Sequence, residues 1–492
     1  MRKPLHTLGF LFAVFILLGV ISLVIPEQGW KINDNITINF PTFKQILNPE
    51  DVEYADISKI VEQHSDTTSI LQPDTVTKNQ DTIRANADSL KKHIHAIEMT
   101  KEGRSKLNSF FQKLKNASSD INPVRIWHYG DSQIESGRIT SFIRENLQRS
   151  FGGYGPGLLS LTPVTQKLSW RVNPDGNWDR YTLFGKVDST LPHKRFGPML
   201  SISRFAPFWN DSLPNDSTLY KASVFIKNSF MGYKHTHRFT NAWLYYGNNY
   251  KPVQITLKDK DEKVIQVDSL PVSLNKFNAY RLPVQAGLSE FSMHFESYDS
   301  PDFYGLSLET DKGVLVDNFP LRGSSGLLFT RVNYGFYLQQ LKYFDVDMII
   351  MQFGINVVSE DKENFDYYER WIYHQLQTIK KMRPEIPVLV IGPSDMATKK
   401  GTKYVSYESV SKIRTALKNA TIRSGYCFWD LYEAMGGKNS MPSWVFAQPP
   451  LAGKDFTHFN HKGARIISNM LYNALMFEYQ NYLNNTPAKD DD

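Results

Sequence analysis

Residues 124–132, with the sequence VRIWHYGDS, decide the fold class of this chain. The first five of them predict a strand, and Gly130 follows that strand after one residue, Tyr129. The apolar spacing of a helix then returns over residues 135–147. A strand, a tight glycine turn and a helix in this order form the first βα unit of an α/β sheet.

The same alternation resumes in the second half of the chain. Residues 347–352 (DMIIMQ) and 387–391 (PVLVI) predict buried strands, because their side chains are almost all apolar, as in a sheet covered on both faces. Further patterns predict a short strand at 427–431 and helices at 101–115, 367–382, 406–419 and 463–479. The alternation predicts a doubly wound, mostly parallel sheet.

Between these halves, residues 166–310 carry a different pattern. Short runs of alternating apolar and polar residues are separated by turn signals such as Asn173-Pro174-Asp175-Gly176. Because the βα alternation stops here and resumes only near Val316, we predict a β-sandwich inserted into the α/β domain. The Trp and Tyr residues of this insert fit either a sandwich core or a surface that faces sugar.

Composition narrows the class of protein. The chain has 492 residues, 41% hydrophobic and 22% charged, as soluble globular proteins do, and its length allows two or three domains. A net charge of +6 without a basic stripe does not predict nucleic-acid binding. A single cysteine, Cys427, excludes an intrachain disulfide framework and a thiolate-rich zinc site.

The N-terminal sequence predicts where in the cell the protein is located. Arg2 and Lys3 precede an apolar run at residues 8–25, which at about 1.5 Å per residue spans a bilayer core of about 30 Å. Positive charge before the run places the N-terminus inside the cell. We therefore predict a signal anchor at residues 1–30, a single membrane pass and an extracytoplasmic or periplasmic catalytic domain. A cleaved signal peptide is the alternative, although no A-x-A site follows the run.

Residues 31–99 are predicted to be a flexible tether. Residues 64–88 are rich in Ser, Thr, Asp, Asn and Gln, so they cannot bury enough apolar surface to offset the chain entropy. A small folded domain is the alternative, because residues 36–43 and 52–60 carry some apolar pattern. At the other end, residues 483–492 are predicted to be a disordered tail.

Three widely separated segments carry reactive side chains. Ser132 lies at the end of the first predicted strand, where open α/β sheets bind ligands and where backbone N–H groups suit a developing oxyanion. Asp455 and His458 share one loop, so the carboxylate can fix the imidazole as a base for a serine. Asn356, two residues after Gly354, has an amide that can donate to an oxyanion. Each segment alone also fits a helix cap, a surface hydrogen bond or a turn.

Taken together, in the order Ser, Gly-x-Asn and Asp-x-x-His, these segments resemble the SGNH (GDSL-like) hydrolase family. The resemblance covers the two parts of one hydrolase domain, residues 100–165 and 311–482, and it implies a flavodoxin-like three-layer fold. It implies a catalytic triad of Ser132, Asp455 and His458. It also implies an oxyanion hole formed by the backbone N–H groups of Ser132 and Gly323 and the side-chain amide of Asn356.

Two positions depart from the family pattern. Val357 stands where many members have Asp, and Gln133 replaces the commoner leucine, but neither change removes a group that the mechanism needs. Four residues near the motifs are candidate substrate contacts: Asp131, Gln133, Arg322 and Ser394. For Arg322 the alternatives are an anionic glycan group and a structural ion pair.

The layout, with a membrane segment and an insert that looks like a carbohydrate-binding module, is similar to that of GDSL-type peptidoglycan O-acetylesterases. The resemblance implies an extracytoplasmic serine esterase that removes O-acetyl groups from a cell-envelope or extracellular polysaccharide through an acyl-serine, without metal or organic cofactor. One alternative is an O-acetyltransferase that acts beside a membrane O-acyltransferase partner. The other, a non-catalytic glycan-binding protein, is disfavoured because every triad group is present.

Overall fold

The computed structural model of the chain describes residues 3–26, 29–33, 36–38, 40–44, 52–64, 94–185, 187–208, 217–229 and 231–485. Most of the predicted flexible stretch at residues 64–88 therefore lies outside the described residues, as do residues 486–492 of the predicted tail.

A six-stranded sheet forms the centre of the α/β domain, in the order β16-β4-β17-β18-β21-β3. Its parallel strands are β4 (Val124–Gly130), β16 (Val314–Pro320), β17 (Val346–Gln352), β18 (Val388–Ile391) and β21 (Cys427–Trp429), and the short β3 (Glu98–Met99) pairs antiparallel at one edge. Counted along the chain, the parallel strands follow the flavodoxin-like order 2-1-3-4-5, whose switch point lies between β4 and β17. The predicted parallel sheet is confirmed.

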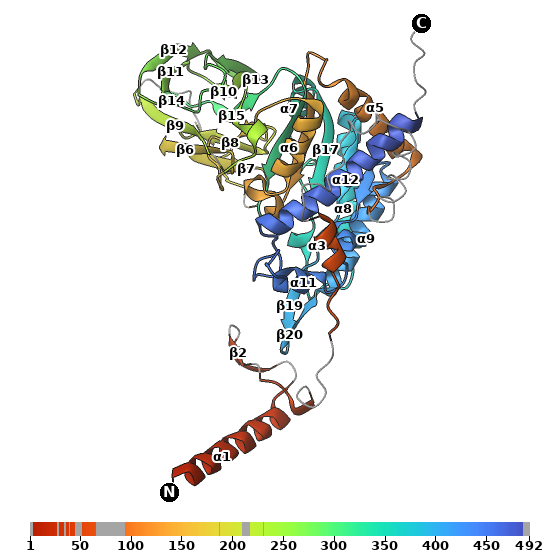
Figure 1. Ribbon diagram of the computed structural model, residues 1–492. Helices are drawn as coiled ribbons and strands as arrows, with labels where there is room; N and C mark the ends of the chain where they lie inside the picture. Colours follow the sequence, from red (N-terminus) through yellow and green to blue (C-terminus); the bar gives the residue numbers. More distant parts are fainter. Residues whose placement is uncertain are drawn as a thin grey trace.

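Helices cover both faces of this sheet (Figure 1). Successive side chains of a strand point to opposite faces, so Ile126 of β4 packs into one buried cluster and Trp127 into the other. The first cluster includes side chains of α5 (Lys101–Asn116), α6 (Thr140–Phe151) and α12 (His461–Asn485), and the second includes those of α7 (Tyr334–Tyr343), α8 (Asp366–Met382) and α9 (Glu408–Arg423).

The segment after β4 differs from the prediction. A helix was expected from residue 135, but Ser132–Gly137 is the 3-10 helix η3 and the α-helix begins only at Thr140. Within η3, Glu135 is non-helical and Ser136 adopts a left-handed conformation with φ of 56°. The apolar spacing continues through this kink, which is why the sequence alone does not reveal it.

Two antiparallel sheets lie between β4 and β16 in the chain, and we call residues 157–309 the strand-rich region. One sheet has the order β13-β10-β15-β8-β7, with β5 beside β15, and the other has the order β12-β11-β14-β9-β6. Buried side chains of both sheets, among them Val224, Leu244 and Phe295, share one apolar cluster. The strands are β5 (Gly157–Leu159), β6 (Trp170–Gly176), β7 (Asp179–Thr182), β8 (Ser201–Arg204), β9 (Tyr220–Asn228), β10 (Asn241–Asn249), β11 (Val253–Asp259), β12 (Val264–Leu270), β13 (Ser273–Leu282), β14 (Glu290–Ser297) and β15 (Asp302–Glu309).

The N-terminal helix α1 (Lys3–Val24) lies at the end of the molecule opposite the strand-rich region (Figure 1). Its segment His6–Val24 has a mean hydropathy of 2.7 and is almost entirely unburied. The helix is long and apolar enough to cross a membrane or to serve as a signal sequence.

Part of the predicted tether packs against the α/β domain instead. Ile57 is buried in the same cluster as α12, and the backbone N–H of Ala55 donates to the carbonyl of Asn439 at 3.3 Å. Farther on, the indole N–H of Trp429 donates to the carbonyl of His95 at 3.1 Å. The tether prediction therefore does not hold for residues 52–64 and 94–99, whose apolar pattern has a partner in the folded domain.

The remaining elements connect or flank these layers. They are β1 (Trp30–Asn33), β2 (Ile36–Ile38), α3 (Ser58–His64), η4 (Lys234–His237), η5 (Ile355–Val357), β19 (Ala397–Lys400), β20 (Lys403–Ser406), α10 (Leu431–Ala434) and α11 (Ser440–Phe446).

Candidate active site

The loops that follow β4, β16 and β17 meet at the carboxyl-terminal edge of the parallel sheet. The N–H of Leu321, after β16, donates to the carbonyl of Gly130 at 2.7 Å, and the N–H of Asp131 donates to the carbonyl of Gln352 at 3.1 Å. These two backbone hydrogen bonds hold the ends of the three strands, and so the starts of the three loops, next to each other. The switch point of the sheet thus brings three of the predicted motifs to one rim.

Ser132, His458 and Asp455 form a continuous hydrogen-bonded chain. The Oγ of Ser132 lies 2.7 Å from Nε2 of His458, and Nδ1 of His458 lies 2.7 Å from Oδ2 of Asp455. The backbone N–H groups of His458 and Thr457 also donate to the other oxygen of Asp455, each at 3.1 Å. This loop geometry fixes the carboxylate behind the imidazole, with Nε2 directed at the serine.

The electrostatics of this chain suit proton transfer from Ser132. Partial burial raises the pKa of Asp455, but the hydrogen bonds from the side chain and backbone of His458 and from the backbone of Thr457 outweigh it, so the pKa lies below its ordinary value. The carboxylate is therefore ionised near neutral pH and can stabilise an imidazolium. The side chain of His458 is 32% exposed, so a substrate can approach it from solvent.

Gly323 and Asn356 lie on loops of the same rim. The Nδ2 of Asn356 donates to the carbonyl of Ser324 at 3.1 Å, which connects the loop after β17 to the loop that carries Gly323. Gly323 has a φ of 77° and is exposed, and no atom lies within 4 Å of the place where a Cβ would stand. By contrast, a Cβ on Gly354 would lie 3.1 Å from Pro393, so this glycine permits close packing beside Asn356.

Three of the four predicted substrate contacts are buried, which corrects the prediction. Asp131, Gln133 and Ser394 are 0%, 2% and 1% exposed, so they cannot touch a bound polysaccharide. Burial raises the pKa of Asp131 to about 7, and its Oδ1 accepts a hydrogen bond from the backbone N–H of Gln133 at 3.0 Å. Asp131 is therefore the cap of η3.

Gln133 instead supports the loop that carries the imidazole. Its Nε2 donates to the carbonyl of Thr457 at 2.7 Å and to Oγ of Ser394 at 3.1 Å. Because Thr457 lies between Asp455 and His458, this bond ties the acid–base loop to the residue that follows Ser132. The sequence shows no signal for this role, since the bond joins residues 324 positions apart.

The fourth predicted contact, Arg322, is engaged in an ion pair. Its guanidinium makes a two-pronged contact with the carboxylate of Glu135, with Nη2 and Oε2 2.7 Å apart. This is the structural alternative that the sequence left open, although 59% of the Arg322 side chain is still exposed. Glu135 itself was missed at the sequence level, because its partner follows a different strand.

Nothing in the described part of the chain gathers the side chains of a metal site: no group of three His, Cys, Asp or Glu residues there is arranged to hold an ion. His235 contacts the carboxylate of Glu145 through Nδ1 at 2.7 Å. This side-chain contact joins the strand-rich region to α6.

Comparison with solved structures shows that one of them, a peptidoglycan O-acetylesterase, has a similar fold. The chain is similar to a peptidoglycan O-acetylesterase, with a TM-score of 0.59 and 15% sequence identity over 78% of this chain and 99% of that chain. A GDSL-like lipase from Parabacteroides merdae also matches, at a TM-score of 0.24 and 15% identity over 33% of this chain and 73% of that chain. No protein-family model and no curated protein matches the chain.

Proposed function

We propose that the protein is a serine esterase that removes O-acetyl groups from a polysaccharide. The observation that carries this proposal is the unbroken contact from Ser132 through His458 to Asp455, with 2.7 Å at each step. Hydroxyl, imidazole and carboxylate in this order form the arrangement that activates a serine for acyl transfer. The similarity to a peptidoglycan O-acetylesterase supports an acetyl ester as the bond that is cleaved.

In the proposed mechanism, His458 takes the proton of Ser132 as its Oγ attacks the ester carbonyl. Asp455 stabilises the imidazolium, and the backbone N–H groups of Ser132 and Gly323 with the amide of Asn356 donate to the oxyanion. His458 then protonates the leaving sugar oxygen, which leaves an acetyl group on Ser132. Water, deprotonated by the same imidazole, attacks this acyl-serine and releases acetate.

The proposed location is the outer side of a membrane. The support is the apolar segment His6–Val24 of α1, which precedes the α/β domain and follows Arg2 and Lys3 in the sequence. The strand-rich region is proposed to be an inserted module that contacts the glycan, since it lies between the first and second motif segments in the chain.

Replacement of Ser132 tests the proposal. The variant Ser132→Ala should lose about a millionfold in kcat with p-nitrophenyl acetate, because the nucleophile is gone, while the thermal unfolding temperature stays within a few degrees. Unchanged turnover in the folded variant would remove the assignment. Mass spectrometry of the wild-type protein, quenched at low pH, should find an acetyl group on the peptide that carries Ser132.

The same acyl-serine serves an acetyltransferase, so the acceptor needs its own measurement. With acetylated glycan as donor and a second, unacetylated glycan present, an esterase releases acetate at the same rate and leaves the second glycan unmodified. Transfer of labelled acetyl to the second glycan would assign the transferase activity instead.

A further inference from the structure

A pocket of about 280 Å³ lies between the strand-rich region and the rim of the α/β domain. On the α/β side it is lined by Glu135 and Ser136 of η3 and by the end of β16 with Arg322. Glu135 and Ser136 directly follow the Ser132 segment, and Arg322 directly precedes Gly323. The pocket is therefore adjacent in the chain to both sides of the candidate active site.

The opposite walls come from the strand-rich region and are mainly apolar. They include Leu159, Val164, Trp170, Phe184 and Met199. Apolar side chains of this kind pack against the C–H faces of a ring or against a short carbon chain. Such walls alone do not say which polar group a ligand carries.

The charged groups that line the pocket are unbalanced. Three lining residues are basic, namely Lys167, Arg180 and Arg322. One lining residue, Glu135, carries a carboxylate. The carboxylate of Glu135 is already held by the guanidinium of Arg322. Lys167 and Arg180 are therefore left without an acidic partner in the pocket.

Lys167 is a partly buried cation whose hydrogen bonding is incomplete. Within the described residues, the single contact of its Nζ is to the backbone carbonyl of Leu158, at 2.6 Å. Burial and the positive charge of Arg144 together lower its pKa to about 7, and Asp317 offsets only part of this shift. An ammonium carries three donors, so an anion in the pocket would find donors available.

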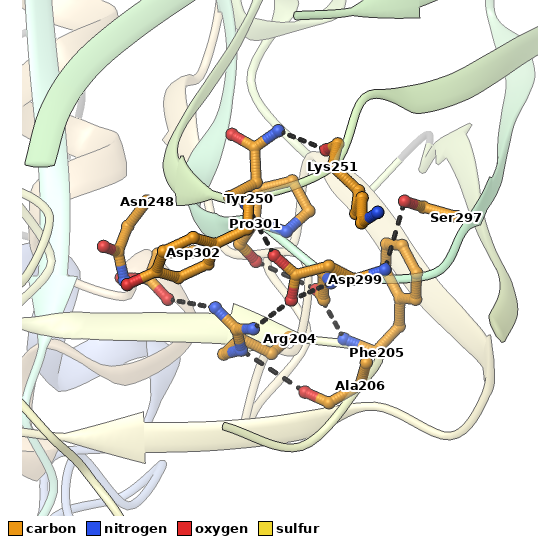
Figure 2. Close-up of polar contacts among 12 residues, drawn as sticks. Arg204, Phe205, Ala206, Asn248, Tyr250, Lys251, Ser297, Asp299, Pro301 and Asp302 are labelled. Carbon is orange, nitrogen blue, oxygen red and sulfur yellow. Dashed lines mark hydrogen bonds and ion pairs between the residues drawn. The ribbon is translucent and has the colours of Figure 1, made fainter. Parts of the chain in front are cut away.

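Arg180 is likewise unpaired, in contrast to an arginine on the neighbouring strand. Its Nε is buried, and the described parts of the chain supply no hydrogen-bond partner for its guanidinium. In the β7–β8 ladder, Arg180 lies opposite Ser203, next to Arg204. Figure 2 shows that Arg204 contacts two carboxylates, Asp302 at 2.8 Å and Asp299 at 3.0 Å.

The buried Arg204 is thus neutralised by carboxylates of the chain itself, whereas the partly buried Arg180 has no such partner among the described residues. Both carboxylates that pair with Arg204 are fully buried, as an internal ion pair needs. A buried cation without such a partner destabilises the protein unless a bound anion supplies the missing charge. Asn318 also lines the pocket, and its buried Nδ2 has no hydrogen-bond partner among the described residues.

We propose that this pocket binds a carboxylate carried by the glycan substrate, with Lys167 and Arg180 as its cationic partners. The proposal rests on the proposed esterase function, because it places an acidic sugar unit beside the ester that Ser132 attacks. A guanidinium and an ammonium favour a carboxylate through charge-assisted hydrogen bonds, and the apolar walls accept the carbon frame that carries it. The carboxylate belongs to the sugar ring, as in a uronic acid, or to an ether-linked acid substituent.

Matched acetylated sugars test this proposal. Three methyl glycosides are compared: O-acetyl N-acetylglucosamine, which is neutral, the same sugar with a lactyl ether, and O-acetyl glucuronic acid. The wild-type protein should hydrolyse at least one acidic sugar with a kcat/KM about 10- to 100-fold above the neutral sugar, as expected for one or two charge-assisted bonds. The preferred acidic sugar identifies the source of the carboxylate.

The variants Lys167→Met and Arg180→Gln should each lower kcat/KM about tenfold or more for the acidic sugar, mainly through KM. Turnover of p-nitrophenyl acetate and of the neutral sugar should stay within about twofold. Arg171→Gln, which removes an exposed charge from β6, is the matched control and should change none of these values. The unfolding temperatures of both pocket variants should not fall, because an unpaired buried charge is removed.

Equal rates for acidic and neutral sugars in the wild-type protein would overturn the proposal, as would equal losses on all substrates in the pocket variants. Calorimetric binding of the acidic sugar to Ser132→Ala, with and without Lys167→Met, separates the two proposals. If the sugar binds in a way that depends on Lys167 but the wild-type protein hydrolyses no ester, the pocket proposal is retained and the esterase proposal is rejected. Hydrolysis without such binding would do the reverse.

Discussion

The rim of the α/β sheet and the facing wall of the strand-rich region treat charge in opposite ways. At the rim, His458 is held by Asp455, and Arg322 by Glu135, so these two cationic side chains have acidic partners within the chain. On the facing wall, Lys167 and Arg180 have no acidic partner among the residues that the structure describes. The difference teaches that the groups proposed for acyl transfer are paired within the chain, whereas the proposed ligand would supply the charge that the facing wall lacks.

The largest expected effect comes from the carboxylate of the rim. Asp455→Asn should lower kcat about a hundred- to ten-thousandfold, because the amide no longer stabilises the imidazolium or fixes its tautomer. Partial exposure of Asp455 lets water replace some of this stabilisation, which favours the lower end. Steady-state rates on acidic and neutral acetyl sugars should fall by the same factor. A loss confined to the acidic sugar would break the comparison.

The oxyanion donor comes next. Asn356→Ala should lower kcat about a hundred- to a thousandfold with little change in KM, because the amide is expected to contact the oxygen only when it carries negative charge. Asn356→Asp is the matched variant of the same size, and it should be at least as impaired because it brings a negative charge to the oxyanion. Rates within threefold of wild type in both variants would remove Asn356 from the oxyanion hole.

A smaller effect is expected from the support behind the rim. Gln133→Met keeps the volume of the side chain but removes the bonds to Thr457 and Ser394, so the imidazole loop shifts slightly. We expect kcat to fall about tenfold while KM stays constant, since the residue positions His458 without touching substrate. A rise in KM alone would show that Gln133 contacts substrate after all.

The smallest effect concerns stability. Burial raises the pKa of Asp395 to about 6, above its ordinary value of 3.8, although hydrogen bonds from Met441 and Ser406 oppose the shift. The folded protein therefore holds this proton between about pH 4 and 6, where the unfolded chain has lost it. Stability consequently falls as pH rises through this window, by up to about 3 kcal/mol from this group.

Asp395→Asn should remove that pH dependence while it keeps an acceptor oxygen for Ser406 and Met441. Chemical denaturation should find the variant about 1 to 3 kcal/mol more stable at pH 7 and equal to wild type at pH 4. An unchanged slope of stability against pH would show that Asp395 is ionised throughout. The variant sharpens the comparison, because it measures what an unpaired buried acid costs on the α/β side.

Local pattern in the sequence determined the parallel strands, because fully buried strands such as residues 347–352 consist of apolar runs that few other structures tolerate. It also singled out Ser132, Asp455 and His458 by their motifs, and the fold brings these three side chains into hydrogen-bond contact. The kink in η3 escaped it, because a left-handed Ser136 changes the backbone without changing the apolar spacing.

Only the tertiary structure decided which polar residues are exposed to solvent, which pair with each other and which line a pocket without an acidic partner there. Asp131 and Ser394 look like site residues in the sequence and are buried, while Lys167 and Arg180 carry no motif and line a pocket. The physical reason is that a charge acquires its role from partners on other strands and loops. Those distances are set by the packing of whole layers, and the spacing of residues along one segment does not contain them.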